Sequence, residues 1–349
     1  MAAASMPALD RLPAPAPPAD VGADGALERV LTSYDTCYVW RYGSPSSALR
    51  ELYAKAKRDQ WDGAKDLDWS IDVDPEAPIL PAEINPLRDY APYRKMDARE
   101  QLRVRHCQVA WQLSQFMHGE QGALIVASQL VSTVPFMDAK LYAASQTMDE
   151  ARHVEVFSRY LRDKIEWEWP INENLKRLLD TIIQDARWDL KYLGMQILVE
   201  GLAMAAFANF HQLTSEKLLK DLIHLVMRDE SRHVAFGVLS LQDYYATMPA
   251  SELRDREDFV VTACELMRDR LIGEETADEF GLEREPYKQC MLESPILQLF
   301  RVQLFTRVVP NLRRLGLLTP RVRSAFDRLG ILQFEHADPA AQDAALGLA

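Results

Sequence analysis

Two segments of this 349-residue chain carry nearly the same pattern, and this duplication constrains the fold more than any other feature. Each segment starts with a glutamate in an apolar run, Glu120 in the first and Glu200 in the second. Each ends in the pentapeptide Asp-Glu-x-Arg-His, at 149–153 and at 229–233. In both segments the glutamate of the pentapeptide follows the first glutamate by 30 residues, so the spacing is duplicated together with the motif.

The middle of each 30-residue interval has the residues of a turn. Pro135 lies midway in the first interval, and proline costs about 3 kcal/mol inside a helix, so it belongs at a turn or a first helical position. Ser215 lies midway in the second interval, in a Thr-Ser-Glu stretch that is typical of a helix N-cap. The sequence therefore predicts two antiparallel helix pairs, each bringing its first glutamate level with its Glu-x-x-His.

The two pairs of helices would converge on one point, because residues three apart share a helix face. Packed face to face, they direct four carboxylates and two imidazoles into the bundle: Glu120, Glu150, His153, Glu200, Glu230 and His233. Apolar residues surround Glu200 on its own face, at Ile197, Ala203, Met204 and Phe207. A carboxylate buried there needs a charged partner or a metal, and oxygen with imidazole ligands suits iron or manganese. We therefore expect these six residues to be both metal ligands and catalytic residues.

The pentapeptides also supply groups that would hold the ligands in place. A metal-bound histidine usually donates its second ring N–H to a carboxylate. We expect Asp149 to reach His233 and Asp229 to reach His153, across the two helix pairs. The arginines of the two pentapeptides would pair with these aspartates: Arg152 and Arg232.

Composition is that of an ordinary globular chain, with 48% hydrophobic and 26% charged residues. The net charge of −12 comes without basic clusters and argues against nucleic-acid binding. Four cysteines lack metal or redox spacing, which favours reduced thiols and a cytoplasmic protein. The sequence shows neither a signal-peptide pattern nor an apolar run of membrane-spanning length, so no membrane partner is expected.

By these motifs the chain resembles the superfamily of ferritin-like di-iron oxygenases and ribonucleotide reductase small subunits. The pentapeptides are similar to those of bacterial multicomponent monooxygenase hydroxylases, and the runs 118–124 and 148–156 are similar to benzoyl-coenzyme A epoxidase. The resemblance implies an all-α fold, a ferritin-like four-helix bundle with additional N- and C-terminal helices. It also implies two iron ions, or a manganese–iron pair, on the six residues named above.

Four positions depart from patterns within that superfamily. Phe157 stands where standard reductase small subunits keep a radical tyrosine, which excludes a stable tyrosyl radical there. Ala203 stands where acyl desaturases have a threonine, and Met204 where the multicomponent enzymes have one. Val226 replaces the additional histidine of the p-aminobenzoate N-oxygenase and cannot bind metal.

Three parts of the chain are expected. Residues 1–27 are rich in Ala and Pro and read as a disordered tail, residues 28–335 as the ferritin-like di-metal domain, and residues 336–349 as a frayed C-terminal tail. Helices are expected from about Ser47, and at 97–132, 136–164, 172–185, 188–213 and 216–247, with about three more after Ser251.

The function that these patterns favour is O2-dependent oxygenation of an apolar or aromatic small molecule by a di-iron enzyme of the monooxygenase type. Hydroxylation, epoxidation and N-oxygenation stay open. Since no flavin or cluster motif is present, a ferredoxin or flavin reductase would supply two electrons, unless the substrate supplies them. An apolar wall beside the metals is expected from five residues, each of which could instead be core packing: Leu124, Ala127, Phe157, Met204 and Phe207. A homodimer is considered. The alternatives are ferritin- or rubrerythrin-like iron oxidation and storage, and a helical scaffold without metal.

Overall fold

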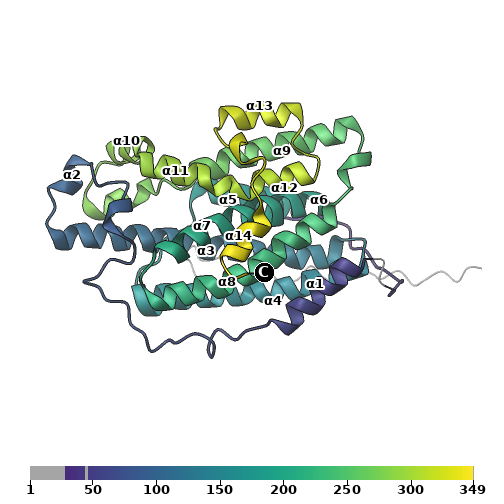
Figure 1. Ribbon diagram of the computed structural model, residues 1–349, viewed down its shortest axis with the longest axis horizontal. Helices are drawn as coiled ribbons and strands as arrows, with labels where there is room; N and C mark the ends of the chain where they lie inside the picture. Colours follow the sequence, from purple (N-terminus) through teal and green to yellow (C-terminus); the bar gives the residue numbers. More distant parts are fainter. Residues whose placement is uncertain (1–27, 44–45, 349) are drawn as a thin grey trace, which may run out of the picture. The chain divides into compact units, whose positions relative to one another are not determined.

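The computed structural model describes residues 28–43 and 46–348 of the chain (Figure 1). Contacts divide the chain into two units, residues 1–31 and residues 32–349, and the second unit carries every element described below. The described residues form helices and turns, without a β-strand. The all-α prediction is thereby confirmed, whereas the tail expected at 1–27 lies outside the described residues.

Four long helices form the central bundle: α3 (Ala98–Thr133), α4 (Met137–Tyr160), α7 (Glu200–Leu213) and α8 (Lys217–Leu241). They make two antiparallel pairs, α3 with α4 and α7 with α8 (Figure 1). α3 starts at a capping box, in which Asp97 accepts from the Glu100 N–H and Glu100 accepts from the Asp97 N–H. The first turn is centred on Pro135 and the second on Ser215, as predicted from the sequence.

The helix expected at 188–213 is interrupted. A short α6 (Trp188–Tyr192) passes into a π-helical segment, η3 (Leu193–Val199), and only then into α7. Gly194 in this segment faces α5 (Glu173–Gln184), and a Cβ there would lie 2.6 Å from Cγ1 of Ile182. A wider π turn therefore stands directly before Glu200, which the 3.6-residue periodicity of the sequence does not reveal.

The second helix of each pair also differs from expectation at its C-terminal end. α4 continues as a π segment, η2 (Leu161–Ile165), which stops at Glu166 with a left-handed φ of 56°. The helix expected at 216–247 stops at Leu241, and a short 3-10 turn, η4 (Tyr245–Thr247), follows.

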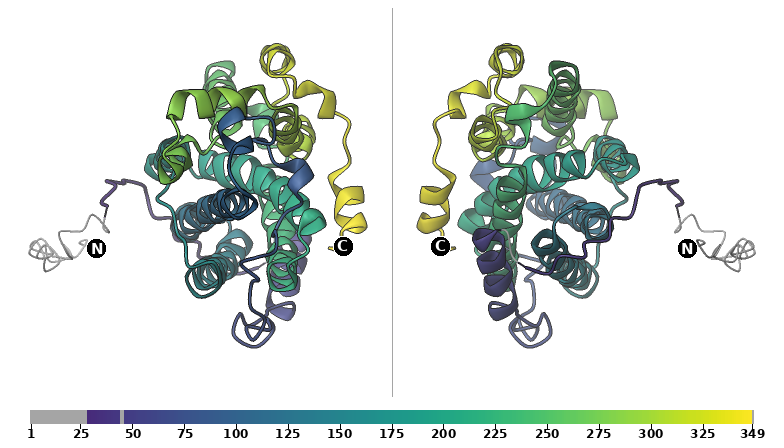
Figure 2. Two further views of the ribbon diagram at one scale, coloured as in Figure 1. Left: turned by 90° about the vertical axis from the view of Figure 1, so that its left-hand side faces the viewer. Right: turned by 90° about the vertical axis from the view of Figure 1, so that its right-hand side faces the viewer.

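The helix before the bundle, α1 (Ser47–Arg58), lies against both α4 and α8 (Figures 1 and 2). Ser46 caps its first turn, and Arg50 pairs with Asp138 of α4 at 2.7 Å. The chain then places Gln60 and Trp61 over the bundle, with Trp61 only 8% exposed. Two short elements lead from here to α3: η1 (Ala82–Ile84) and α2 (Ala91–Arg94).

The C-terminal part has more elements than the three helices expected. They are α9 (Ala250–Asp269), η5 (Glu274–Phe280), α10 (Arg284–Glu293), α11 (Pro295–Gln303), η6 (Leu304–Thr306), α12 (Val308–Arg314), α13 (Pro320–Arg328), η7 (Leu332–Phe334) and α14 (Pro339–Ala345). α9 packs on α5 and η3, and η6 packs on α7, so this part covers the α5–α7 side of the bundle (Figure 2).

Residues 336–349 are not simply frayed, because α14 lies within them. Asp338 caps its N-terminus, and Pro339 occupies the first helical position, where proline is favoured. Asp343 accepts from the Ser231 hydroxyl at 2.9 Å and pairs with Arg307. Two tertiary contacts therefore anchor a segment whose composition alone suggested an unattached end.

The stretch Trp188–Leu213 is long and apolar enough to cross a membrane by length and composition, contrary to the expectation from sequence. However, 83% of its most apolar window is buried inside the protein, and it carries Glu200. We therefore interpret it as a core helix.

Candidate metal centre

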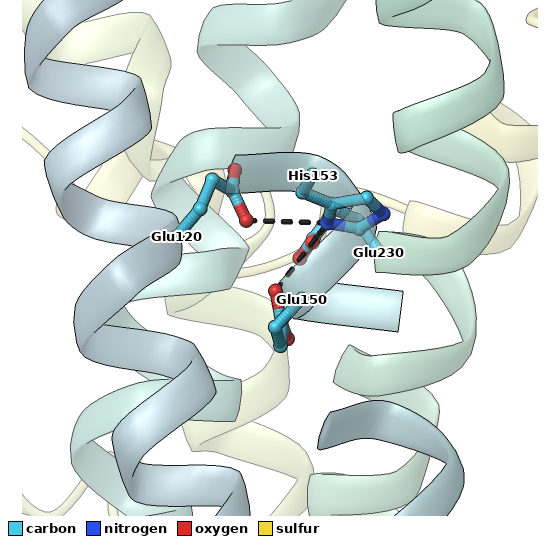
Figure 3. A group of neighbouring side chains, drawn as sticks. All are labelled: Glu120, Glu150, His153 and Glu230. Atoms are coloured by element: carbon cyan, nitrogen blue, oxygen red, sulfur yellow. Dashed lines mark hydrogen bonds and ion pairs between the residues drawn. The ribbon is translucent and has the colours of Figure 1, made fainter. Parts of the chain in front are cut away.

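The six predicted ligands come together in the interior of the bundle, from α3, α4, α7 and α8. All are at most 5% exposed. They form two groups in which one ligand atom from each residue lies within 4.8 Å of the others. The first group is Glu120, Glu150, His153 and Glu230 (Figure 3), and the second is Glu150, Glu200 and His233. Glu150 belongs to both groups, so the two clusters are adjacent.

Both imidazoles turn Nδ1 toward the carboxylates. Nδ1 of His153 lies 3.2 Å from Oε2 of Glu120 and 3.2 Å from Oε1 of Glu230 (Figure 3). Nδ1 of His233 lies 3.1 Å from Oε1 of Glu150 and 3.4 Å from Oε1 of Glu230. Glu230 therefore lies beside both histidines, which makes it, like Glu150, a residue common to the two halves.

Several buried atoms of this cluster make no hydrogen bond among the described residues, although most of them lie at ion-pair distance from one another. They are Oε2 of Glu150, Oε2 of Glu200, both carboxylate oxygens of Glu230, and Nδ1 of His233. Two imidazoles do not balance the charge of four buried carboxylates, and buried charges are normally paired or bound to metal. The donor set, carboxylate oxygens with imidazole nitrogens, thus fits two divalent cations of the iron or manganese type.

The charge balance points the same way. Burial, together with the nearby charge of Glu230, raises the pKa of Glu120 and of Glu200 well above the usual value. Burial by itself lowers the pKa of His153 and of His233, but contacts to the surrounding carboxylates raise both above the ordinary value. The carboxylates therefore repel one another within the cluster, and the positive charge of bound cations would relieve this repulsion.

The aspartates and arginines of the pentapeptides lie in the crossed arrangement expected from the sequence. Nε2 of His153 lies 3.2 Å from Oδ2 of Asp229, and Nε2 of His233 lies 3.3 Å from Oδ2 of Asp149. Nη2 of Arg152 lies 2.6 Å from an oxygen of each aspartate. Arg232 pairs with Asp229 and lies 3.5 Å from Asp149. Each histidine is thus held from behind by the opposite helix pair.

Two residues after α1 complete this network, and the sequence did not indicate their contacts with the aspartates of the pentapeptides. The Trp61 indole N–H donates to Oδ2 of Asp229 at 2.7 Å, and the Gln60 amide donates to Oδ1 of Asp149 at 2.8 Å. Arg152 lies over the Trp61 ring, 4.6 Å from its centroid. No spacing rule links residues 60 and 61 to the pentapeptides, so only the fold reveals these contacts.

Gln146 is a second residue that the motifs did not indicate. It is fully buried, and its amide donates to Oε1 of Glu150 at 2.9 Å and to Oε1 of Glu200 at 2.8 Å. It therefore ties carboxylates from two helix pairs together. Its position one helical turn before Glu150 was a signal, because residues four apart share a face.

A small cavity of about 20 Å³ adjoins the carboxylates. Its wall includes small residues three positions after the first glutamates, Ala123 and Ala203, together with the rings of Phe116 and Phe207. Of the five residues predicted for an apolar wall, only Phe207 lines this cavity; the others do not: Leu124, Ala127, Phe157 and Met204. Phe157 instead stacks on Phe207, with ring centroids 5.9 Å apart.

Arg270 gives the same cavity one positive charge. It is 5% exposed, its Nε has no hydrogen-bond partner, and no ion pair to it occurs among the described residues. Burial lowers the pKa of Arg270 to about 10. An unpaired guanidinium beside a cavity is costly for the fold, and its position is therefore of functional interest.

A helical bundle with this buried carboxylate and imidazole cluster defines a ferritin-like protein of the di-metal carboxylate class. The sequence model of the p-aminobenzoate N-oxygenase AurF family matches residues 44–316, so the chain belongs to that family. No curated protein matches the chain in sequence.

Solved structures resemble the chain in fold. Dimanganese(II)-NrdF of Streptococcus sanguinis gives a TM-score of 0.51 at 14% identity, over 85% of this chain and 100% of that chain. An R2-like ligand-binding oxidase with aerobically reconstituted metal cofactor after photoconversion gives 0.49 at 17% identity, over 79% and 99%. At these identities the likeness concerns the fold alone.

Family membership confirms the superfamily expected from the motifs and, with it, an O2-dependent di-iron oxygenase. It favours the oxygenase over iron storage and over a scaffold without metal. Val226 still distinguishes this chain from the pattern expected of the p-aminobenzoate enzyme. It is fully buried on α8, one turn before Glu230, and its side chain cannot bind metal, whereas an additional histidine was expected at this position in that enzyme.

Proposed function

We propose that this chain binds two iron ions on the six clustered residues and uses O2 to oxygenate an apolar or aromatic small molecule. Glu120 and His153 would serve one ion, and Glu200 with His233 the other. The carboxylates beside both histidines would serve both ions: Glu150 and Glu230. The observation that carries the proposal is the convergence of four carboxylates and two imidazoles in one buried cluster, where several of their atoms make no hydrogen bond among the described residues. A manganese–iron pair would satisfy the same atoms.

The ions would supply O2 binding and redox chemistry, and the chain would control their surroundings. Asp149 and Asp229 would accept the Nε2 protons of the histidines, which leaves Nδ1 free to bind metal. The Phe116 and Phe207 rings would exclude water from the reacting side of the cluster.

Inserting one oxygen atom into the substrate while the other leaves as water consumes O2, two electrons and two protons. We propose that a ferredoxin or flavin reductase supplies the electrons. Hydroxylation, epoxidation and N-oxygenation share this balance. The site also lacks a seventh metal ligand at Val226, where the p-aminobenzoate enzyme was expected to have a histidine.

The test starts with anaerobic loading by Fe(II), metal counting, and rapid mixing with O2. The proposal expects about two irons per chain and a transient visible absorption that decays faster with a substrate. The first aromatic to try is p-aminobenzoate, from the description of the family. Glu200→Gln should lower the iron content, whereas Glu155→Gln, at an exposed position on α4, should not. A wild-type protein that binds no iron would refute the proposal.

The remaining proposals concern the whole protein. We propose that residues 28–335 form one di-metal domain on which α14 packs, that the protein is cytoplasmic, and that it is a homodimer. Gel filtration tests the last point, since a storage cage would elute as a much larger particle and a monomer would contradict the dimer.

A further inference from the structure

A second and much larger cavity lies further along the bundle from the metal cluster. Its volume is about 360 Å³, within the range of small-molecule sites. It is bounded by residues 79–86, α3, the end of α7, residues 271–276, α10 and α11. Apolar side chains make up most of its wall, for example Ile272, Met291 and Leu297.

Three polar side chains in this wall have buried donor atoms that find no acceptor within the described part of the chain. They are Nδ2 of Asn85, Nε and Nη1 of Arg105, and Nε2 of Gln112. Asn85 is 5% exposed, and its amide orientation is fixed because Oδ1 accepts the Leu87 N–H at 3.0 Å. Its NH2 group is therefore left with no partner, and buried donors of this kind normally have one.

The charges in the wall have a single sign. Arg105 is the one charged residue that lines the cavity, and among the described residues no Asp or Glu lines it. No ion pair to Arg105 occurs within the described part of the chain. In a protein with a net charge of −12, an unpaired cation beside two unpaired amide donors selects for an acceptor-rich, negatively charged group.

The cavity ends at the aromatic layer beside the metal cluster. Phe210 lines it, and the Phe116 ring, which lines the small inner cavity, lies 5.5 Å from the Phe210 ring. Gln112 and Glu120 are eight residues apart on α3, which corresponds to roughly 12 Å along the helix axis. A ligand in the large cavity is therefore separated from the carboxylates by this layer.

We propose that this cavity is a binding site for an amphipathic organic anion. The anionic group would meet Arg105, Asn85 and Gln112, and the apolar body would lie against Ile272, Leu297 and Phe210. The same chemistry fits a substrate that passes the aromatic layer and an effector that remains outside it. Binding at this site does not depend on the proposed metal chemistry, so it can be tested separately.

The test uses two fluorescent probes with one apolar body. 8-Anilinonaphthalene-1-sulfonate has a sulfonate, and N-phenyl-1-naphthylamine lacks it. Both are titrated into the iron-loaded protein, whose metal content is measured on the same sample. One sulfonate probe should bind per chain. Arg105→Met should raise the dissociation constant of the sulfonate probe by about ten- to a hundredfold, which corresponds to the loss of one charged hydrogen bond. The dissociation constant of the neutral probe should stay within about twofold of the wild-type value.

The matched control is Arg103→Met. Arg103 lies on the same helix but is exposed, and it pairs with Glu279 outside the cavity, so both probes should bind as they do to the wild type. Leu297→Trp should weaken both probes by filling the cavity, and Gln112→Leu provides a second variant if the tryptophan impairs folding. Wild-type affinity of Arg105→Met for the sulfonate probe would overturn the proposal, as would binding that neither Leu297→Trp nor Gln112→Leu affects.

The absorption spectrum of the iron distinguishes the two sources of ligand. A spectral change on binding of the sulfonate probe supports a site continuous with the metals, as a substrate requires. An unchanged spectrum at full occupancy supports an effector site outside the aromatic layer. Normal iron content without probe binding refutes this inference alone, and probe binding without iron refutes the proposed function alone.

Discussion

Replacing Arg270 by methionine should stabilise the protein. Methionine keeps the apolar stem and removes the buried charge. Burial lowers the pKa of Arg270 from 12.5 to about 10. At roughly 1.4 kcal/mol per pH unit, this change corresponds to about 3.5 kcal/mol of penalty for the charged form. Because the stem packing is only partly reproduced, we expect Arg270→Met to raise the free energy of unfolding by about 1–3 kcal/mol.

The assay is urea unfolding of the variant and the wild type at one pH, with matched iron content. Arg256→Met is the control, since Arg256 is equally buried but pairs with Asp189 at 2.9 Å. Removing it leaves a buried aspartate unpaired and should cost about 3–5 kcal/mol. The two substitutions are alike in chemistry and should have opposite signs.

A loss of stability in Arg270→Met would refute this reasoning, because it would mean that the guanidinium makes net favourable contacts. The functional counterpart concerns the cavity beside the carboxylates. If the charge is retained for ligand recognition, Arg270→Met should weaken the binding of an anionic aromatic such as benzoate more than it weakens the binding of uncharged aniline. An equal change in both dissociation constants would argue that Arg270 acts only through the fold.

Three further predictions follow from contacts within the bundle. Gln146→Leu should weaken iron binding by about 10–100-fold, because the two carboxylates that its amide holds lose their common donor; wild-type affinity in a metal-competition titration would contradict this. Gly237→Ala should lower the free energy of unfolding by about 1–3 kcal/mol, since the new Cβ would lie 2.6 Å from Cβ of Gln196. Gly119→Ala has open space around the new Cβ and should raise the free energy of unfolding by about 0.5–1 kcal/mol, as measured by thermal unfolding. Equal effects of the two glycine substitutions would exclude the steric explanation. Burial lowers the pKa of Lys191 from 10.5 to about 8, because the folded protein disfavours the charged amine. The free energy of unfolding is therefore highest above pH 10.5, where Lys191 is neutral in both states, and this gain is lost as the pH falls through 8. Lys191→Met should therefore flatten the rise in unfolding free energy between pH 8 and pH 10, and an unchanged slope would contradict the assignment.

Most of the fold follows from two kinds of local signal. Turn chemistry at Pro135 and Ser215 and the duplicated motif are sufficient to predict both helix pairs and their register. The C-terminal part was less predictable, because helices such as α10 and α14 are short and are fixed by tertiary contacts. Asp343, for example, anchors α14 through Arg307, which is distant in sequence.

Of the candidate site, residues with helical spacing could be predicted, whereas contacts between distant segments could not. The six clustered side chains repeat at three-residue and 30-residue intervals, which the sequence displays directly. Trp61 reaches Asp229 across the fold, and no periodicity connects them. The inner cavity was misplaced by about one position on each helix, since it opens at Ala123 and Ala203 instead of Leu124 and Met204. Which side of a helix faces empty space depends on packing against all its neighbours.

The segment after α1 makes the two halves of the duplicated site unequal. The motifs at 149–153 and 229–233 are alike, but an indole N–H meets the aspartate behind His153 while an amide N–H meets the aspartate behind His233. Among the described residues, the Trp61 indole stacks near the first imidazole, with ring centroids 6.4 Å apart, and no second indole stacks in the same way on His233. Two ions held by these halves would therefore be inequivalent, with different basicity at their histidines. A duplicated sequence thus produces a centre whose two halves differ, so the two halves would bind their ions with different affinities.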